Sequence, residues 1–353
     1  MNMRSLTVAA ATALTVALTT PLSALAVEPT PPPAPSPTAS STASSEPAPS
    51  EVTDPIMSPH SPNGVPAGPV GRPYLTWPLA SSHSKLHPGS RPMGANDWSC
   101  RPSPGTRPVV LIPGTGEDAF ATWSLYAPQL KAAGLCVYTF NVNPVTNPMD
   151  EAKPFSGHIR SSAAFLGTFV DRVLASTGAD KVDLVGHSQG GGPLPRAYLK
   201  YEGGSAKVAR LIGLVPSNHG TTVYGLQKLL AREGTASNWL LTTNARLHNN
   251  YALPEQLVGS PFLTDLNKGG MTQPGVEYTV ITTRYDDVVT PYTNAVIDEP
   301  GVKNIVMQDL CTLDHTDHFG FTYDPVALQV VINTLRPEKA TPLKCVYVPG
   351  YIQ

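Results

Sequence analysis

Short continuous apolar runs alternate along this chain with segments whose apolar residues recur at helical spacing. Six runs rich in β-branched residues have the length of strands that are buried on both faces, and they cover 108–112, 136–140, 181–185, 209–215, 277–283 and 302–307. Helical spacing predicts helices over 120–130, 159–173, 223–230 and 326–335. This alternation predicts an α/β fold with a mostly parallel central sheet and helices on both faces.

The first 70 residues have a different character. Residues 1–26 are typical of a secretory signal peptide, with Arg4 before an apolar, threonine-rich core and Ala24-Leu25-Ala26 as a cleavage site. A membrane anchor is the alternative, but this stretch is too short and too polar to span a bilayer well. Residues 27–70 are dominated by proline, serine, threonine and alanine, which predicts a disordered linker. Residues 71–353 then suit one large catalytic domain.

The charge balance excludes some partners. Lysine and arginine total 24 and aspartate and glutamate total 26, a formal net charge of −2, which is no footprint for nucleic acid. No run after the signal approaches 18 apolar residues, so we expect no stable membrane span. With the signal peptide expected over 1–26, we expect an exported protein, secreted or associated with the cell envelope. We expect it to be a monomer.

Four cysteines in an exported chain favour disulfide bonds. Three pairings are possible. We favour Cys100 with Cys136 and Cys311 with Cys345, since each pair closes a loop of about 35 residues and would contribute about 4 kcal/mol of stability on the loop-entropy model. A zinc site is the alternative, which the absence of any C-x-x-C spacing disfavours.

The sequence Gly186-His187-Ser188-Gln189-Gly190 directly follows the strand expected over 181–185, and a helix is expected to begin at once after it. This G-x-S-x-G pattern is typical of a nucleophile elbow, in which a strained serine projects from a strand-to-helix turn. The two glycines remove the Cβ atoms that would crowd such a turn. The pattern therefore predicts that Ser188 is a nucleophile.

A serine nucleophile requires a base and a carboxylate that orients the base. Asp286 follows the strand expected over 277–283, and we favour it over Asp287 because it keeps a D-x-V-V spacing whose apolar pair anchors the loop. Two histidines, His315 and His318, follow the last expected strand, and we favour His318. The density of aspartate and histidine here could indicate a metal site, but no spacing matches a helix-borne ligand pair.

An oxyanion hole requires hydrogen-bond donors close to the nucleophile. The main-chain N–H of Gln189 comes with the elbow, and Thr115 in the loop Pro113-Gly114-Thr115-Gly116 is our choice for the second donor, with its hydroxyl as a third. We interpret His187 as a packing residue and His219 as a residue that braces a loop.

The segment 223–266 stands between two expected strands and contains a short amphipathic pattern. We interpret it as a small helical cap that borders the active site. Ordinary packing in the outer layer of the domain is the alternative.

With these motifs assembled, the chain resembles the secreted bacterial lipases and esterases of the class 2 lipase group in the α/β-hydrolase superfamily. The resemblance covers about 75–353 and is carried by 110–116, 186–191, 218–222, 285–291 and 317–318. Pro-Gly-Thr-Gly with Ser-Gln-Gly-Gly also looks like the yeast lipase B type, in which the threonine supplies main-chain and side-chain donors. Two departures are Pro-Gly where many relatives have His-Gly, and a proline-rich segment at 192–195.

The resemblance implies hydrolysis of carboxylic esters of lipids by a Ser-Asp-His triad, without a metal cofactor. In the yeast type a cysteine shortly before the catalytic histidine pairs with a C-terminal cysteine, which supports Cys311–Cys345 and His318. The expected partner is a lipid or another hydrophobic ester. Two alternatives remain open: an acyltransferase that moves the acyl group to an envelope acceptor, and a non-catalytic envelope interaction protein.

Overall fold

The computed structural model describes residues 57–142, 154–222 and 250–350. The expected signal peptide, the linker up to residue 56 and the first part of the expected cap, 223–249, lie outside the described residues.

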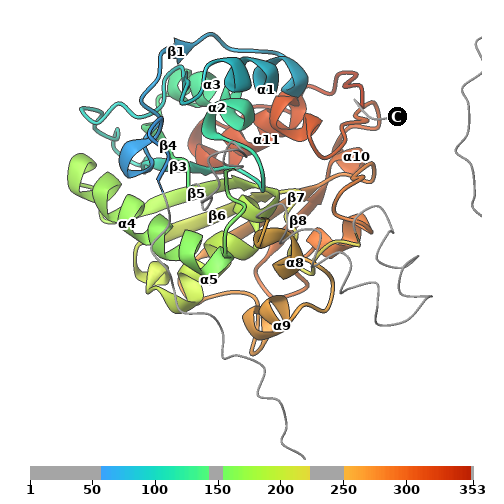
Figure 1. The fold of residues 1–353 in the computed structure, drawn as a ribbon. Coiled ribbons are helices and arrows are strands. Elements are labelled where there is room, and N and C mark those ends of the chain that lie inside the picture. The colour runs from blue at the N-terminus through green and yellow to red at the C-terminus, as the bar shows by residue number, and fades with distance from the viewer. Residues whose placement is uncertain (1–56, 143–153, 223–249, 351–353) are drawn as a thin grey trace, which may run out of the picture. The chain divides into compact units, whose positions relative to one another are not determined.

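A six-stranded sheet forms the centre of the domain, with the strand order β4-β3-β5-β6-β7-β8 (Figure 1). All of its neighbouring strands pair in parallel. The strands are β3 (Val109–Ile112), β4 (Val137–Thr139), β5 (Val182–His187), β6 (Val208–Leu214), β7 (Glu277–Thr282) and β8 (Lys303–Val306). The mostly parallel sheet expected from the sequence is therefore confirmed, and β5 lies inside it between β3 and β6.

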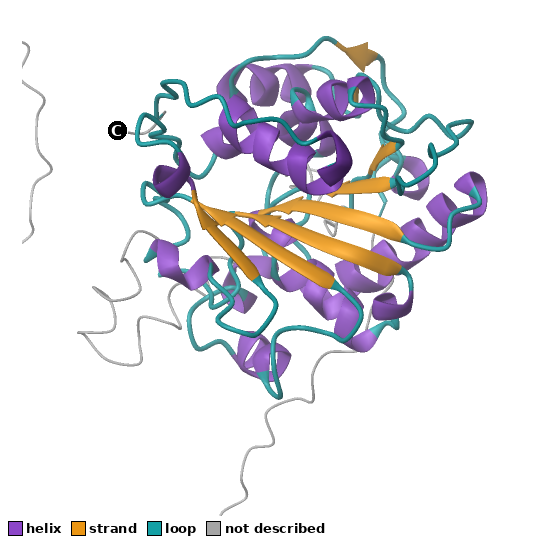
Figure 2. Ribbon diagram, turned by 180° about the vertical axis from the view of Figure 1, so that it is seen from behind, coloured by secondary structure: helices purple, strands orange, loops and turns teal. Residues whose placement is uncertain are grey.

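Helices cover both faces of this sheet, as Figures 1 and 2 show from opposite sides. One layer contains α1 (Trp77–Leu86), α2 (Ala119–Trp123), α3 (Tyr126–Ala132) and α11 (Pro325–Leu335). The other contains α4 (Ile159–Thr177), α5 (Pro193–Tyr201), α8 (Ala252–Glu255) and α9 (Pro261–Asn267). A short helix, α10 (Met307–Leu310), follows β8, and 3₁₀ turns span Pro62–Gly64, Ser188–Gly191, Gly204–Ala206, Tyr292–Ala295, Gly320–Tyr323 and Pro337–Lys339.

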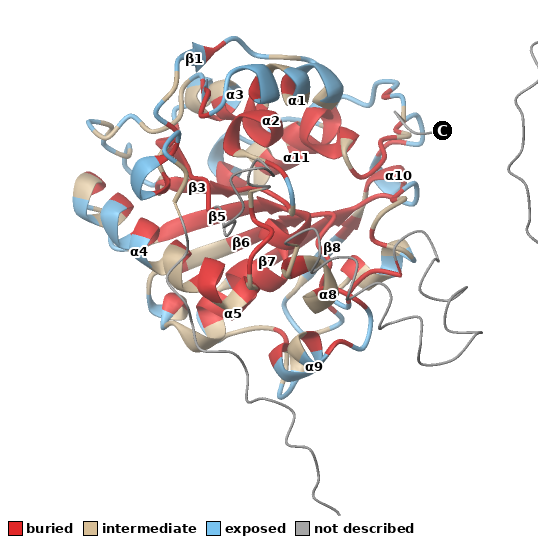
Figure 3. Cartoon of the chain, in the orientation of Figure 1, coloured by how far each residue is buried: buried red, intermediate tan, exposed pale blue. Residues whose placement is uncertain are grey.

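The strands β3, β4 and β5 are buried along their whole length, whereas the edge strand β8 is partly exposed (Figure 3). Successive side chains of β3 point to opposite faces. Val109 and Leu111 accordingly pack in the core under α3 and α11, whereas Val110 and Ile112 pack in the core under α4 and α5. This two-sided burial explains why the strands are continuous apolar runs without a polar alternation.

The single helix expected over 120–130 is two helices, α2 and α3, with a break at Ser124 and Leu125. Phe120 packs in a small cluster with Ala80 and Tyr323, whereas Tyr126 packs in the main core against the sheet. Trp123 of α2 packs in the main core together with Tyr126, so only Phe120 turns toward the small cluster, which periodicity alone did not indicate.

The folded region begins before residue 71, where we expected the linker to end. Ser61 is buried, and its Oγ accepts a hydrogen bond from Asn141 Nδ2 at 3.0 Å. The main-chain N–H of Asn141 donates to the carbonyl of Gly64 at 2.8 Å. The strand β1 (Val70–Gly71) pairs with β2 (Arg91–Pro92). Residues 57–70 thus belong to the packed domain.

The structure contains the disulfide bonds Cys100–Cys136 and Cys311–Cys345, the pairing that the sequence favoured. The first joins the chain before β3 to the start of β4, and the second joins the loop after α10 to the C-terminal segment. Within the described residues, no helix has the length and apolarity needed to cross a membrane.

Candidate active site

Ser188 lies at the end of β5 with a φ of 55°, a left-handed conformation that is strained for a serine. The turn is possible because two glycines flank it. A Cβ added to Gly186 would lie 1.7 Å from the carbonyl oxygen of Gly190, and one added to Gly190 would lie 2.3 Å from the carbonyl oxygen of Pro113. The steric reason for G-x-S-x-G is therefore visible as backbone packed directly against backbone.

The sequence predicts a helix that begins at once after Ser188, but the structure differs. A 3₁₀ turn covers Ser188–Gly191, and Gly192 then adopts φ −131° and ψ −99°, which is not helical. The helix α5 begins at Pro193, where a missing N–H costs nothing because the first helical N–H groups have no intrahelical partner. The proline-rich stretch is thus accommodated in the first turn of α5.

Asp286 and His318 meet in a buried hydrogen bond between the loops after β7 and β8. The Nδ1 atom of His318 lies 3.0 Å from Oδ1 and 3.2 Å from Oδ2 of Asp286. Oδ1 of Asp286 also accepts the main-chain N–H groups of Val288 and Val289, at 3.0 and 2.8 Å. The main-chain N–H groups of Val288 and Val289 therefore hold the carboxylate of Asp286 in place.

This contact determines the tautomer of His318. A carboxylate only accepts hydrogen bonds, so Nδ1 carries the proton and Nε2 of a neutral ring has a free lone pair. Burial alone would lower the pKa of His318, but the charge and hydrogen bond of Asp286 outweigh it, and the pKa lies above its ordinary value. Such a ring can accept a proton at Nε2.

The competing residues Asp287 and His315 make different contacts from those of Asp286 and His318. Asp287 Oδ1 accepts the main-chain N–H of His318 at 3.4 Å, and burial raises the pKa of Asp287. The ring of His315 packs against Tyr285 in a tilted arrangement and against Tyr347 edge-on, with centroid distances of 4.9 and 5.8 Å.

Thr115 lies in the loop after β3, and its hydroxyl oxygen accepts two amide hydrogen bonds. Gln189 Nε2 donates to Thr115 Oγ1 at 2.9 Å, and Gln256 Nε2 donates at 2.8 Å. A hydroxyl has two acceptor lone pairs and one hydrogen. Because both lone pairs are occupied, the remaining capacity of Thr115 Oγ1 is to donate.

Gln256 is a residue that the sequence did not single out. It is buried, and its Oε1 accepts the hydroxyl hydrogen of Ser217 at 2.7 Å, which turns Nε2 toward Thr115. No local motif marks a glutamine at the end of α8, so only the folded structure shows that it reaches the loop after β3.

His187 and Glu117 form a further buried pair that we did not expect. Glu117 Oε2 lies 2.9 Å from His187 Nδ1, and His187 Nε2 lies 2.9 Å from the main-chain oxygen of His318. Our interpretation of His187 as a packing residue was wrong, because both ring nitrogens are engaged in polar contacts. The signal in the sequence was an acid, Glu117, directly after the Pro-Gly-Thr-Gly loop.

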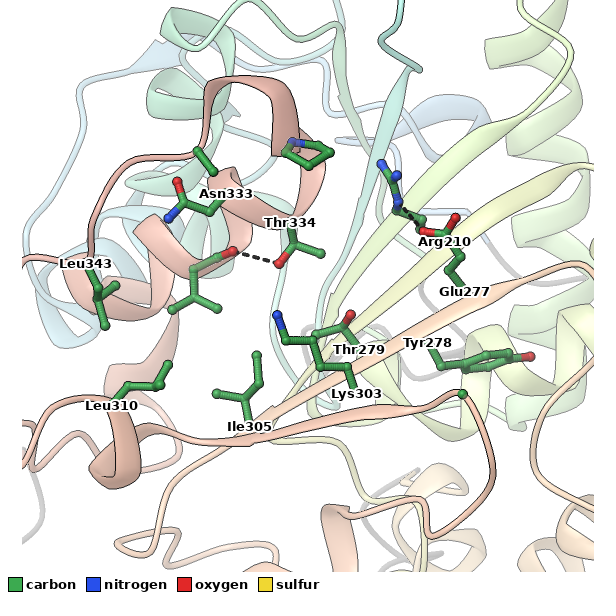
Figure 4. A pocket seen from close by; sticks show the side chains of 14 residues that line it. Arg210, Glu277, Tyr278, Thr279, Lys303, Ile305, Leu310, Asn333, Thr334 and Leu343 are labelled. Atoms are coloured by element: carbon green, nitrogen blue, oxygen red, sulfur yellow. Dashed lines mark hydrogen bonds and ion pairs between the residues drawn. The ribbon is translucent and has the colours of Figure 1, made fainter.

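A separate hollow of about 610 Å³ lies between β7, β8 and α11 (Figure 4). Its walls combine apolar side chains such as Ile305 and Leu343 with the ion pair of Arg210 and Glu277, at 2.7 Å. None of the candidate site residues lines it. This hollow is therefore separate from the candidate active site.

A parallel sheet with a strained serine turn at the end of its central strand β5 defines an α/β-hydrolase. The sequence profile of the class 2 lipases matches residues 106–331, more than half of the chain, and the chain belongs to this family. The comparison with curated proteins gave no significant match.

Two solved lipases share the fold. The structure is similar to lipase B of Aspergillus fumigatus, with 21% identity and a TM-score of 0.52 over 70% of this chain and 55% of that one. It is also similar to the propeptide form of the Bacillus licheniformis lipase BlEst2, with 16% identity and a TM-score of 0.50 over 70% of this chain and 53% of that one. The chain thus spans about half the length of these two proteins.

Proposed function

We propose that this protein is a secreted serine hydrolase that cleaves carboxylic esters of lipids with Ser188, Asp286 and His318 as its triad. The observation that carries the proposal is the buried hydrogen bond from His318 Nδ1 to Asp286, which leaves Nε2 as the basic nitrogen. Membership of the class 2 lipase family supports an ester as the substrate.

The reaction would proceed in two halves. His318 Nε2 accepts the hydroxyl proton of Ser188 as Oγ attacks the ester carbonyl carbon, and the resulting imidazolium is stabilised by Asp286. Collapse of the tetrahedral intermediate breaks the ester C–O bond, and His318 returns its proton to the leaving alcohol. Water, activated by the same imidazole, then attacks the acyl-enzyme and releases the carboxylic acid and free Ser188.

The oxyanion of both intermediates would be held by the main-chain N–H of Gln189 and by the main-chain N–H and hydroxyl of Thr115. The two amides that donate to Thr115 Oγ1 support a donating role for this hydroxyl. Charge develops on the oxyanion only in the transition state, so these donors would lower the barrier without tightening substrate binding.

Thr115→Val should lower kcat by about 10² to 10³-fold, the usual cost of one lost oxyanion donor, with a small effect on KM. Thr115→Ser retains the hydroxyl and is the matched control. Initial rates of p-nitrophenyl ester hydrolysis measure both. A valine variant as active as the serine variant would exclude the Thr115 hydroxyl as an oxyanion donor.

Export of the chain is part of the proposal. The two disulfide bonds support it, because such bonds persist in oxidising compartments. Residues 1–26 would be the signal peptide, the proline-rich residues after it the linker, and the remainder one monomeric catalytic domain. The hydrophobic ester substrate would be met outside the cytoplasm.

The proposal is tested by release of p-nitrophenol from acetate, octanoate and palmitate esters and by release of fatty acid from emulsified triacylglycerol. The purified protein should turn over these esters, and a p-nitrophenyl phosphonate should label one residue, identified as Ser188 by peptide mass spectrometry. Ser188→Ala should show neither activity nor labelling. Turnover that survives in Ser188→Ala, or labelling elsewhere, would contradict the proposal, and acylated product in the presence of a carbohydrate acceptor would favour acyl transfer.

A further inference from the structure

We infer that Glu117 and His187 form a positioning pair that holds His318 at a defined place relative to Ser188. In this arrangement His187 donates its Nε2 hydrogen to the main-chain oxygen of His318, and Glu117 orients the ring of His187. The inference rests on the proposed triad, because it assigns a role to the residues that support its base.

The contacts of the pair form a closed cycle that includes the loop carrying His318. Glu117 Oε2 lies 2.9 Å from His187 Nδ1, and His187 Nε2 lies 2.9 Å from the oxygen of His318. Trp77 Nε1 donates to Glu117 Oε1 at 3.0 Å, and the Trp77 ring stacks on Phe319 with a centroid distance of 4.7 Å. This cycle of contacts is closed because Phe319 follows His318 in the chain.

The donors and acceptors in this cycle of contacts determine which atoms carry hydrogens. A main-chain carbonyl only accepts, so His187 Nε2 must carry a hydrogen. Glu117 Oε1 accepts a hydrogen bond from Trp77 Nε1, as suits an ionised carboxylate. The hydroxyl of Thr122 lies 3.2 Å from Glu117 Oε2 and shares its single hydrogen with the main-chain oxygen of Asp118, at 2.8 Å. Burial would raise the pKa of Glu117, but the charge and hydrogen bond of His187 outweigh it, and the pKa lies below its ordinary value.

Both side chains of the pair are almost fully buried, with 1% of His187 and 3% of Glu117 exposed. Water therefore does not compete for these hydrogen bonds, and loss of one would leave a buried polar group unpaired. Space around the pair is also limited, since a Cβ added to Gly114 would lie 3.0 Å from His187 Nδ1 and 3.2 Å from Ser188 Cβ. The pair can thus hold the main chain of His318 at a defined position.

The position of His187 in the chain explains what the pair can do. His187 is the last residue of β5 and directly precedes Ser188, so its side chain starts from the same rigid strand end as the nucleophile. Through one hydrogen bond it reaches the backbone of a residue 131 positions later. A misplacement of about 1 Å between reacting groups can cost about 10²-fold in rate, which is the error that this bond would prevent.

Two substitutions of His187 separate its two contacts. In His187→Asn, the side-chain amide occupies the place of the Nδ1 atom and can face Glu117, but the side chain has no atom at the place of Nε2. In His187→Gln, the side-chain amide reaches the place of the Nε2 atom and can still donate to the main-chain oxygen of His318. His187→Asn should therefore lower kcat by about 10 to 100-fold with KM changed less than about 3-fold, whereas His187→Gln should stay within about 5-fold of the parent.

Two readouts accompany turnover. The rate at which a p-nitrophenyl phosphonate labels Ser188 should fall in His187→Asn by the same factor as kcat. The downfield proton NMR signal of the His318 Nδ1–H hydrogen bonded to Asp286 should broaden or vanish in His187→Asn and persist in His187→Gln. His315→Asn, which alters a half-buried stacked histidine on the same loop, is the control and should leave every readout unchanged.

The outcomes decide the inference. Equal losses in both folded variants, or parent-like values in both, would overturn it, since either result means that the bond to the His318 oxygen has no positioning role. Thermal unfolding checks that the variants are folded, and if His187→Asn is not, loss of activity and of the NMR signal in a folded His187→Gln overturns the inference by itself. An absence of Ser188-dependent turnover in the parent would refute the proposed function, while the NMR comparison would still show whether His187 holds His318.

Discussion

Asp286→Asn is expected to lower kcat for p-nitrophenyl esters by about 10⁴-fold, the loss that this change causes in a serine triad. An asparagine that donates its amide hydrogen to His318 Nδ1 would favour the tautomer with the proton on Nε2. That ring could not accept the proton of Ser188. The loss would thus come from a wrong tautomer in an intact site, and steady-state kinetics together with thermal unfolding would distinguish it from loss of the fold.

Asp287→Asn is the matched control, because it makes the same chemical change one residue away. Asp287 contributes an acceptor to the main-chain N–H of His318 at 3.4 Å, and an asparagine Oδ1 can take over that role. We expect kcat within about 10-fold of the parent. Equal losses in the two variants would mean that the orienting carboxylate is not Asp286 alone.

Gly186→Ala is expected to have the largest effect on stability, with a loss of about 4 kcal/mol or more in the free energy of unfolding. The new Cβ would lie 1.7 Å from the carbonyl oxygen and 2.2 Å from the carbonyl carbon of Gly190. Both obstructing atoms belong to the backbone of the elbow, so no side-chain rotation relieves the clash. A typical domain has only about 5 to 15 kcal/mol of stability, so this variant should accumulate poorly or unfold at much lower urea.

Gly105→Ala is the control for the general cost of replacing a glycine. Gly105 has a φ of 79°, and an added Cβ would meet nothing within 4 Å. Only the left-handed backbone then carries a penalty, about 1 to 2 kcal/mol. Urea unfolding followed by circular dichroism compares the two, and similar midpoints would show that the elbow can relax around a side chain at Gly186.

The local features of this protein were predictable because each depends on residues that are close together in the sequence. Strand periodicity, the two glycines of the elbow and the D-x-V-V spacing after β7 are all readable within a few residues. The apolar pair Val288 and Val289 supports Asp286 through main-chain N–H groups two and three residues away. Such short-range geometry follows from chain connectivity alone.

The contacts that support the candidate site were not predictable. Glu117 and His187 are 70 residues apart, and Gln256 lies 141 residues after Thr115. Nothing in the amino-acid pattern specifies which of many buried polar residues will face one another. The sequence therefore favours a packing role for His187 and does not mark Gln256.

The sequence by itself determined the alternation of strands and helices and the strained turn at Ser188, since backbone sterics and residue type act locally. Only the tertiary structure decided that α2 and α3 are separate, that residues 57–70 pack into the domain and that His187 reaches the backbone of His318. Those results depend on how distant elements pack, because a buried polar group must find its partner in space, wherever the chain brings one.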